Sequence, residues 1–190
     1  MDPTADGRFT RLYELHYLAV LAYCARRVNR SEAEDVSSEV FTVLWRKLDS
    51  VDPESALPWL YSVAFGLVRN RRRAVRRALA LTQRIGRSHP GSEALAADVL
   101  VVRNEQDKEF LAALGQLREK DQEVLRLVIW EEMSAKDAGL VIGCSTSAAE
   151  QRLHRAKKRL ASKFSPNKFS PKSLYRSDAS PQHLEEGGRL

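Results

Sequence analysis

The sequence predicts an all-α protein made of two small helical domains joined by a flexible linker. Apolar residues recur at three- and four-residue intervals in several segments, which is the period of amphipathic helices. No segment alternates apolar and polar residues between turn signals, so strands are not expected. Residues 86–98, GRSHPGSEALAAD, are small and polar and contain Gly and Pro, and they separate the two helical halves.

Three amphipathic segments follow one another in the first half. Residues 9–24 begin the pattern, and residues 36–48 carry a single apolar stripe. Ser31, with an acid three residues later, predicts a capping box for this second helix. Two prolines within residues 49–58, DSVDPESALP, interrupt the pattern. A third segment, residues 59–68, then leads directly into a run of arginines.

The second half ends in two helices separated by a glycine. Helical spacing resumes at residues 110–129, and Ser134 with Asp137 predicts the capped start of a short helix that Gly143 ends. The next helix is expected to begin at Ser145 or Ser147 and to run to about residue 163. The predicted divisions are 1–84 for the first domain, 85–108 for the linker, 109–164 for the second domain and 165–190 for a Ser/Pro/Lys-rich disordered tail.

Composition excludes several classes of protein. The chain has 190 residues and a net charge of +6, with 43% apolar and 29% charged residues, which is too much core material for a wholly disordered chain. No apolar run reaches the roughly 18 residues of a membrane span, and the N-terminus lacks the order of a secretory signal. Two distant cysteines and four scattered histidines predict neither a disulfide framework nor a metal site, and no cofactor is expected. We expect a soluble cytoplasmic protein with an anionic partner.

A strongly basic segment follows Trp59. Residues 55–92 contain eight arginines and no acid. Arginines this close repel one another unless an anion neutralises them, and a guanidinium matches phosphate oxygens bidentately. Trp59 just upstream is a candidate for stacking on unpaired bases, whereas Tyr61 and Phe65 are expected in the core. The alternative is a solvated helix face without a ligand.

Residues 134–160 have the spacing of a helix-turn-helix. Ala149, Leu153, Ala156 and Leu160 form the predicted buried stripe of the second helix. The remaining positions are mostly polar, and the start of such a helix enters the major groove, where Gln pairs with adenine and Arg with guanine. An ordinary helical hairpin with a basic end is the alternative. The candidate DNA contacts are Ser147, Ala148, Gln151, Arg152 and Arg155, with Lys157 and Lys158 on phosphate.

The helix over residues 32–48 is acidic beside its apolar stripe. This acidity gives no advantage on a surface that faces DNA, so we expect it to point elsewhere. Two interpretations remain equal on physical grounds: a face that docks a partner protein, or a solvated face next to the core.

These parts, in this order, resemble the sigma factors of bacterial RNA polymerase, in particular the extracytoplasmic-function group. AEDVSSEVFTVLWRKL is similar to the family's AEDVVQETFLRAWRRL-type segment, and LPWLYSVAFGLVRNRRR to its PWLYGIARNVLANQRR-type segment. The stretch from LGQLREKDQEVL to RLHRAKKRL follows the family's region-four pattern. Together the resemblance covers about residues 8–82 and 107–164.

The resemblance implies a protein that directs transcription initiation without catalysing a reaction. The first domain, region two, would dock on the clamp of the polymerase β′ subunit and would capture a flipped base of the melted −10 element. The second domain, region four, would read the −35 element, with the flap of the β subunit as a further contact. The implied core-binding residues are Glu34, Asp35, Glu39, Val40, Thr42, Val43, Arg46 and Lys47. The implied −10 residues are Ser50, Val51, Asp52, Trp59, Asn70, Arg71, Arg72, Arg73, Arg76 and Arg77.

The chain departs from the family pattern at two sites. Phe65-Gly66 replaces the usual Arg-Asn of the melting helix, and Ala148-Ala149 replaces a bulkier pair at the start of the recognition helix, so no −35 sequence is predicted. The acidic N-terminal segment of long housekeeping sigma factors is absent, so inhibition would come from another protein, for which the family's usual partner is an anti-sigma factor.

Two other hypotheses remain open. A helix-turn-helix regulator that binds duplex DNA as a dimer would account for residues 110–163 but would leave the arginines unexplained. An interaction module that imitates a sigma factor would occupy the polymerase or a regulator. An enzyme is not expected, because no histidine has a carboxylate or cysteine partner at metal or triad spacing.

Overall fold

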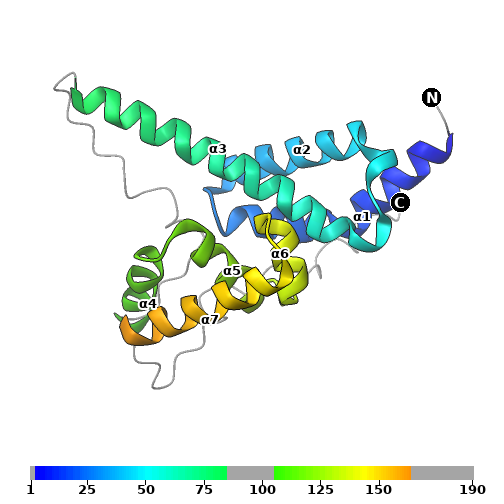
Figure 1. Ribbon diagram of the computed structural model, residues 1–190. Coiled ribbons are helices and arrows are strands. Elements are labelled where there is room, and N and C mark those ends of the chain that lie inside the picture. Colours follow the sequence, from blue (N-terminus) through cyan, green and yellow to red (C-terminus); the bar gives the residue numbers. More distant parts are fainter. Residues whose placement is uncertain (1–2, 85–104, 164–190) are drawn as a thin grey trace, which may run out of the picture.

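The computed structural model describes residues 3–84 and 105–163, and these residues form α-helices and two short 3-10 turns without any strand (Figure 1). The all-α prediction is therefore confirmed. The α-helices are α1 (Pro3–Ala25), α2 (Arg30–Arg46), α3 (Ala56–Arg84), α4 (Glu105–Gly115), α5 (Glu119–Ile129), α6 (Ala135–Ile142) and α7 (Thr146–Lys163), and the 3-10 turns are η1 (Leu48–Ser50) and η2 (Pro53–Ser55).

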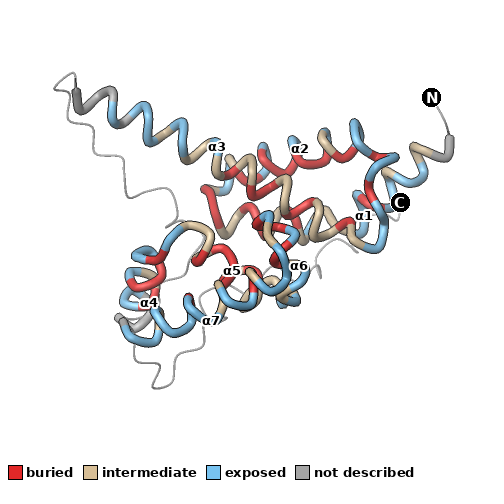
Figure 2. Tube along the Cα trace, viewed as in Figure 1, coloured by how far each residue is buried: buried red, intermediate tan, exposed pale blue. Residues whose placement is uncertain are grey.

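Helices α1, α2 and α3 form the first domain and bury their apolar stripes against one another (Figure 2). Val20, Val36, Leu44 and Leu60 are fully buried at the centre. Tyr61 and Phe65 also lie in this core, as predicted. Because α3 is 29 residues long, or about 44 Å, its C-terminal part extends beyond the bundle and exposes its side chains.

The start of α2 corrects one prediction. Asn29, not Ser31, caps the helix, and its side-chain oxygen accepts a hydrogen bond from the Glu32 N–H at 2.9 Å. The capping box was assigned two residues too late because the sequence there offers both Asn and Ser, two residue types with strong N-cap preference.

The second domain comprises α4 to α7, and its caps agree with the sequence. The Ser134 hydroxyl accepts from the Asp137 N–H at 3.1 Å, and Gly143 ends α6 in the left-handed conformation with φ of 70°. Ala149 and Ala156 on α7 are fully buried, so the predicted stripe faces the core. Helix α6 and helix α7 thus form the expected helix-turn-helix.

The boundaries between the predicted units stay predictions. Helix α3 ends at Arg84, where the first domain was expected to end, but α4 begins at Glu105, inside the predicted linker. The rest of the linker, and the tail at 165–190, lie outside the described residues. Within the described residues the two domains pack directly on each other, with α6 against α3 (Figure 1).

Candidate nucleic-acid and partner interfaces

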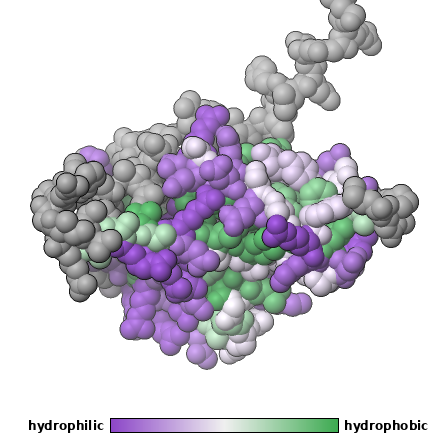
Figure 3. Space-filling view, turned by 90° about the horizontal axis from the view of Figure 1, so that it is seen from above, coloured by the Kyte–Doolittle hydropathy of each residue, from purple (hydrophilic) through white to green (hydrophobic). Residues whose placement is uncertain are grey.

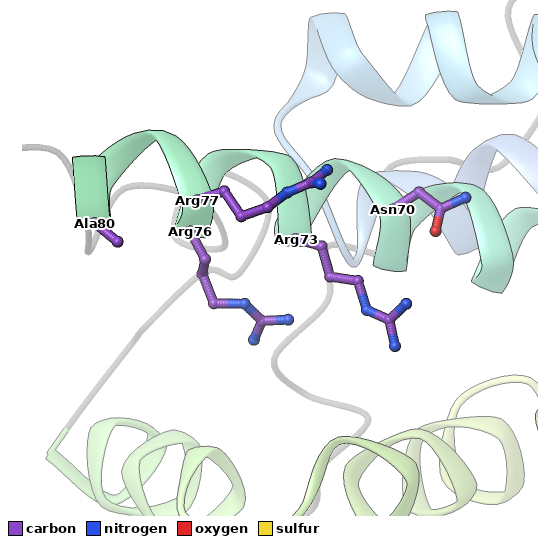
Figure 4. Close-up of a pocket in the computed structure, with 5 residues that line it drawn as sticks. All are labelled: Asn70, Arg73, Arg76, Arg77 and Ala80. Carbon is purple, nitrogen blue, oxygen red and sulfur yellow. The ribbon is translucent and has the colours of Figure 1, made fainter. Parts of the chain in front are cut away.

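The exposed end of α3 carries a basic surface. Asn70, Arg73, Arg76 and Arg77 are exposed and line a shallow hollow of about 470 Å³ (Figure 4). No described carboxylate pairs with these three arginines. A row of guanidinium groups without a neutralising partner favours an anion such as phosphate, and the phosphate contacts expected from the arginine run stay predictions.

The neighbouring arginines of α3 have protein partners instead. Arg71 donates to the Glu32 carbonyl oxygen at 3.1 Å, and it lies 3.4 Å from a carboxylate oxygen of Glu39. Arg72 donates to the carbonyl oxygen of Arg27 at 2.8 Å, and burial, followed by the nearby Arg126, lowers its pKa. The predicted phosphate contact of Arg72 stays a prediction; in this conformation its guanidinium binds a backbone carbonyl within the first domain.

The segment between α2 and α3 is held by local hydrogen bonds. Asp52 accepts from the Glu54 N–H at 3.1 Å, and the Ser50 hydroxyl donates to the Lys47 carbonyl oxygen at 2.8 Å. Ser50 and Asp52 are exposed and available to a ligand. The side chain of Val51 is buried in the core, and its predicted part in the −10 site stays a prediction. Trp59 is partly buried against the core, which leaves part of its ring at the surface.

Helix α7 presents a polar outer face. Ser147, Gln151, Arg155, Lys157 and Lys158 are all exposed. Ala148 is half-buried beside them. Gln151 and Arg155 also line a surface hollow of about 370 Å³ together with Glu150 and His154.

Arg152 departs from the prediction made for this helix. Its Nη1 lies 2.8 Å from the buried carboxylate of Asp121 on α5, and Arg159 reaches the other carboxylate oxygen at 3.2 Å. The side chain of Arg152 thus anchors α7 on α5 in this conformation, and its predicted contact with a base or nearby phosphate stays a prediction. Sequence spacing alone placed Arg152 next to Gln151 and gave no sign of the buried acid 31 residues earlier.

The outer face of α2 remains open to a partner. Glu34, Asp35, Glu39, Thr42, Arg46 and Lys47 are exposed, and Val43 is half-buried. Val40 is fully buried in this structure, and its predicted role in core binding stays a prediction. Val40 lies four residues from both Val36 and Leu44, so the sequence spacing already placed it on the apolar stripe of α2.

An aromatic cluster beside this face was not found from the sequence. Phe9 packs edge-on against Trp45 with ring centroids 5.2 Å apart, and Tyr13 packs edge-on against Phe41 at 4.8 Å. Tyr13 and Trp45 remain 37% and 39% exposed. The four-residue spacing of Phe9 and Tyr13 was the sequence feature that could have indicated this aromatic cluster. Figure 3 shows apolar patches between the larger hydrophilic areas of the surface.

The two domains coincide with two matches to a known protein family. Residues 12–78 match the sequence profile of sigma-70 region 2, and residues 107–160 match that of sigma-70 region 4. The chain belongs to the sigma-70 family. It is an alternative sigma factor of the extracytoplasmic-function group, which directs RNA polymerase to initiate transcription.

Curated relatives agree with this assignment. The sigma factor is 29% identical over 167 residues to RNA polymerase sigma factor CnrH of Cupriavidus metallidurans, a match that covers 80% of this chain and 84% of the relative. It is 27% identical over 157 residues to sigma factor NccH of Alcaligenes xylosoxydans xylosoxydans, with the same coverage.

Solved structures share the fold. The sigma factor RpoE, solved in complex with the anti-sigma factor NepR from Bartonella quintana, matches with a TM-score of 0.57 at 22% identity, over 81% of this chain and 94% of RpoE. CnrH, solved in complex with the cytosolic domain of CnrY, matches with a TM-score of 0.51 at 26% identity, over 81% and 85% of the chains.

Two further observations concern the described ranges 3–84 and 105–163. No helix there combines the length and apolar character that crossing a bilayer requires. No three or more His, Cys, Asp or Glu side chains gather there as a set that could hold a metal ion.

Proposed function

We propose that this sigma factor uses three surfaces for three ligands. The exposed end of α3, with the segment before it, binds the −10 element, and the outer face of α7 binds the −35 element. The outer face of α2 docks on the polymerase core. The observation that carries the proposal is the separation of charge. Arg73 and Arg76 extend from the side of α3 that faces away from the other first-domain helices, and Arg77 lies along α3 beside them (Figure 4). The acids Glu34, Asp35 and Glu39 lie on a different helix, α2. Phosphate attracts the first surface and repels the second.

On α3 the proposed DNA contacts are the residues that no described protein group neutralises. Arg73, Arg76 and Arg77 are placed on phosphate, with Asn70 beside them. Ser50 and Asp52 border the site of a flipped base, and the exposed part of Trp59 offers a stacking surface. Stacking and phosphate contacts together must offset the few kcal/mol that base extraction costs.

On α7 the proposed base contacts are the exposed Ser147, Gln151 and Arg155, with Lys157 and Lys158 on phosphate. Ala148 contributes only a small apolar surface at the start of the helix. Linking two weak DNA-binding surfaces in one chain gives selectivity that neither domain has alone.

The proposed core-binding surface is the exposed face of α2. Its acids Glu34, Asp35 and Glu39 are joined there by Thr42 and by the basic Arg46 and Lys47. The half-exposed rings of Tyr13 and Trp45 extend this face with the aromatic character that is enriched in protein interfaces. By its family likeness, this face fits the clamp of the β′ subunit, and region four fits the β flap.

We further propose that the sigma factor acts in the cytoplasm and is controlled by an anti-sigma factor. Its relative CnrH was solved with the cytosolic domain of CnrY, and RpoE with an anti-sigma factor. A protein partner of this kind would compete with the polymerase for the exposed surfaces.

Core binding is tested by size-exclusion chromatography with the RNA polymerase core, followed by run-off transcription. The native chain should co-elute with the core at sub-micromolar concentration. Asp35→Lys should weaken co-elution, whereas Glu14→Lys, the same type of charge change at an exposed site on α1, should leave it intact. If the native chain is folded and binds DNA but does not co-elute, the protein is a DNA-binding regulator and the proposal is wrong.

DNA binding is tested by the salt dependence of the promoter complex. Replacing Arg73, Arg76 and Arg77 by Ala should flatten the plot of log K against log salt by about 0.9 for each phosphate that the protein no longer neutralises. Arg72→Ala should instead lower the stability of the first domain and leave the slope unchanged, because its guanidinium binds a backbone carbonyl. An unchanged slope in the triple variant would reject the phosphate role of α3.

A further inference from the structure

Helix α7 carries one acid on a face that is otherwise basic. Glu150 is exposed, and every other charged side chain of the helix is a lysine or an arginine. A carboxylate repels the phosphates of any DNA that approaches, so Glu150 weakens binding to all sequences alike. An acid at this position needs a reason on a surface that is proposed to bind DNA.

Helix stability and ion pairing do not account for Glu150. Helix α7 begins at Thr146 and has no acid in its first turn, so Glu150 lies beyond the stretch where a carboxylate stabilises the helix dipole. The ion pairs that α7 forms within residues 3–84 and 105–163 are made by Arg152 and Arg159, and both go to Asp121. The carboxylate of Glu150 is therefore left for a ligand.

Glu150 borders the space that the proposed base contacts share. It lines the surface hollow of about 370 Å³ together with Gln151, His154 and Arg155. Ser147, three residues before it, and His154, four residues after it, are its neighbours along the helix surface. Glu150 also lies in the N-terminal half of α7, the half that enters the major groove in a helix-turn-helix. A base edge that reaches Gln151 or Arg155 therefore also meets this carboxylate.

The chemistry of a carboxylate distinguishes the four bases. An ionised carboxylate only accepts hydrogen bonds. In the major groove guanine presents two acceptors, thymine an acceptor and a methyl group, and adenine an acceptor beside its amino donor. Cytosine presents its N4 amino donor alone. Cytosine is thus the base whose edge satisfies Glu150 without placing an acceptor against it.

We propose that Glu150 is a specificity-determining residue of the −35 site. Its carboxylate accepts a hydrogen bond from the N4 amino group of a cytosine next to the bases that Gln151 and Arg155 contact, and it repels other bases at that position. The inference rests on the proposed function of α7. An unfavourable contact contributes to this selectivity as much as a favourable one, because the charge also opposes binding to the wrong base and to phosphate alone. The neighbouring cations supply affinity, and Glu150 limits that affinity to DNA with the matching base.

The first test identifies the base. RNA polymerase core with the native chain selects fragments of the bacterium's own genome, and the upstream element is read from the fragments that form promoter complexes. Each base pair of one such element is then replaced in turn, and the dissociation constant is measured with the native chain and with Glu150→Ala. In the native complex, replacing one particular cytosine should weaken binding about tenfold. With Glu150→Ala that penalty should fall below about twofold, while the penalties at the other positions remain.

The second test measures the charge. Glu150→Gln has nearly the same size, lacks the charge and carries an amide that pairs with adenine, so the preferred base should change from cytosine to adenine. The free full-length variant should also bind a promoter-free DNA fragment about two- to fivefold more tightly than the native chain. Glu109→Gln makes the same substitution at an exposed site on α4 and should leave both properties native.

The outcomes separate the role of Glu150 from the proposed function. An upstream element without a required cytosine, or equal base preferences in the native and Glu150→Ala complexes, would overturn the role of Glu150 alone. The same conclusion would follow if Glu150→Gln changed the affinity for polymerase core and not the base preference, because the side chain would then face a protein. Upstream selectivity that persists after Gln151→Ala and Arg155→Ala are combined would refute the proposed −35 site, and the role of Glu150 with it.

Discussion

Asp121 holds α7 in place through two guanidinium groups. Its carboxylate is buried, and Arg152 and Arg159 each contact one of its oxygens. We expect Arg152→Gln to lower the free energy of unfolding by about 1–3 kcal/mol, because it leaves a buried charge with one partner fewer. Gln151→Ala, one residue away on the exposed face, should leave stability within about 0.5 kcal/mol and change the preference for the −35 sequence. Urea denaturation and binding to promoter variants separate the two effects. A changed sequence preference in a fully stable Arg152→Gln protein would contradict the anchoring role.

Deprotonation of the buried Cys24 thiol should destabilise the protein in alkaline solution. Burial raises the pKa of this thiol from its usual 9.0 to about 11. Because the folded state holds the proton more tightly than the unfolded state, the stabilisation is complete below pH 9 and disappears as the pH rises from about 9 to 11. The decrease should approach about 2–3 kcal/mol for this one group. Urea denaturation at several pH values should show a shallower fall for Cys24→Ala, while Cys144→Ala, which keeps Cys24, should follow the native slope. Equal slopes in all three proteins would refute this origin.

The sequence predicted a cluster of arginines on α3, but not which group each arginine contacts. The run Arg71-Arg72-Arg73 reads as three equivalent cations, yet the first binds a carbonyl and an acid of α2, the second a carbonyl after α1, and only the third is exposed without a described partner. Helical geometry turns successive residues by about 100°, so one arginine of three faces away from the bundle. Which one does so depends on where α1 and α2 pack, and this information lies 32 to 45 residues away.

Two glycines of the helical elements should respond in opposite ways to substitution by alanine. Gly66 lies inside α3, and a Cβ there would meet nothing within 4 Å. Gly66→Ala should therefore raise the free energy of unfolding by about 0.5–1 kcal/mol through helix propensity. Gly143 ends α6 with φ of 70°, so Gly143→Ala should lower it by about 1–2 kcal/mol, although nothing obstructs the side chain. Thermal or urea unfolding measures both. A stabilising Gly143→Ala would contradict the left-handed cap.

For whole helices, the sequence was most informative where an apolar stripe is bounded by a capping residue or a terminal glycine. Ser134 and Gly143 gave both ends of α6, because a cap and a left-handed terminus are local properties. The segment between α2 and α3 was harder to predict. Its prolines indicated an interruption, but not that Val51 would enter the core while Ser50 and Asp52 remain exposed. That alternation depends on how η1 and η2 fold back on the bundle.

The packing of the two domains on each other could not be predicted from the spacing of apolar residues. Arg27 and Glu123 are separated by 96 residues, and each looks like an ordinary charged residue at the end or on the face of a helix. The spacing of apolar residues shows which side of a helix is buried. It does not show that a charged side chain will be buried, or that the other domain will cover it. The prediction of two helical domains joined by a flexible linker therefore gave the correct fold class but did not include the interface between the domains.

This interface predicts that the two domains unfold as one cooperative unit. The charges of Arg27 and Glu123 are buried only while both domains are folded and in contact, so unfolding of either domain exposes both charges. In scanning calorimetry the native chain should give a single transition whose calorimetric and van't Hoff enthalpies agree. Glu123→Gln weakens the compensation of Arg27 and should split the transition into two, with a calorimetric enthalpy that exceeds the van't Hoff value. Arg8→Gln, confined to the first domain, should keep the single transition. Two transitions in the native chain would show that the contact is too weak to couple the domains, whereas a single transition in a folded Glu123→Gln protein would show that α3 and α6 couple them without the ion pair of Arg27 and Glu123.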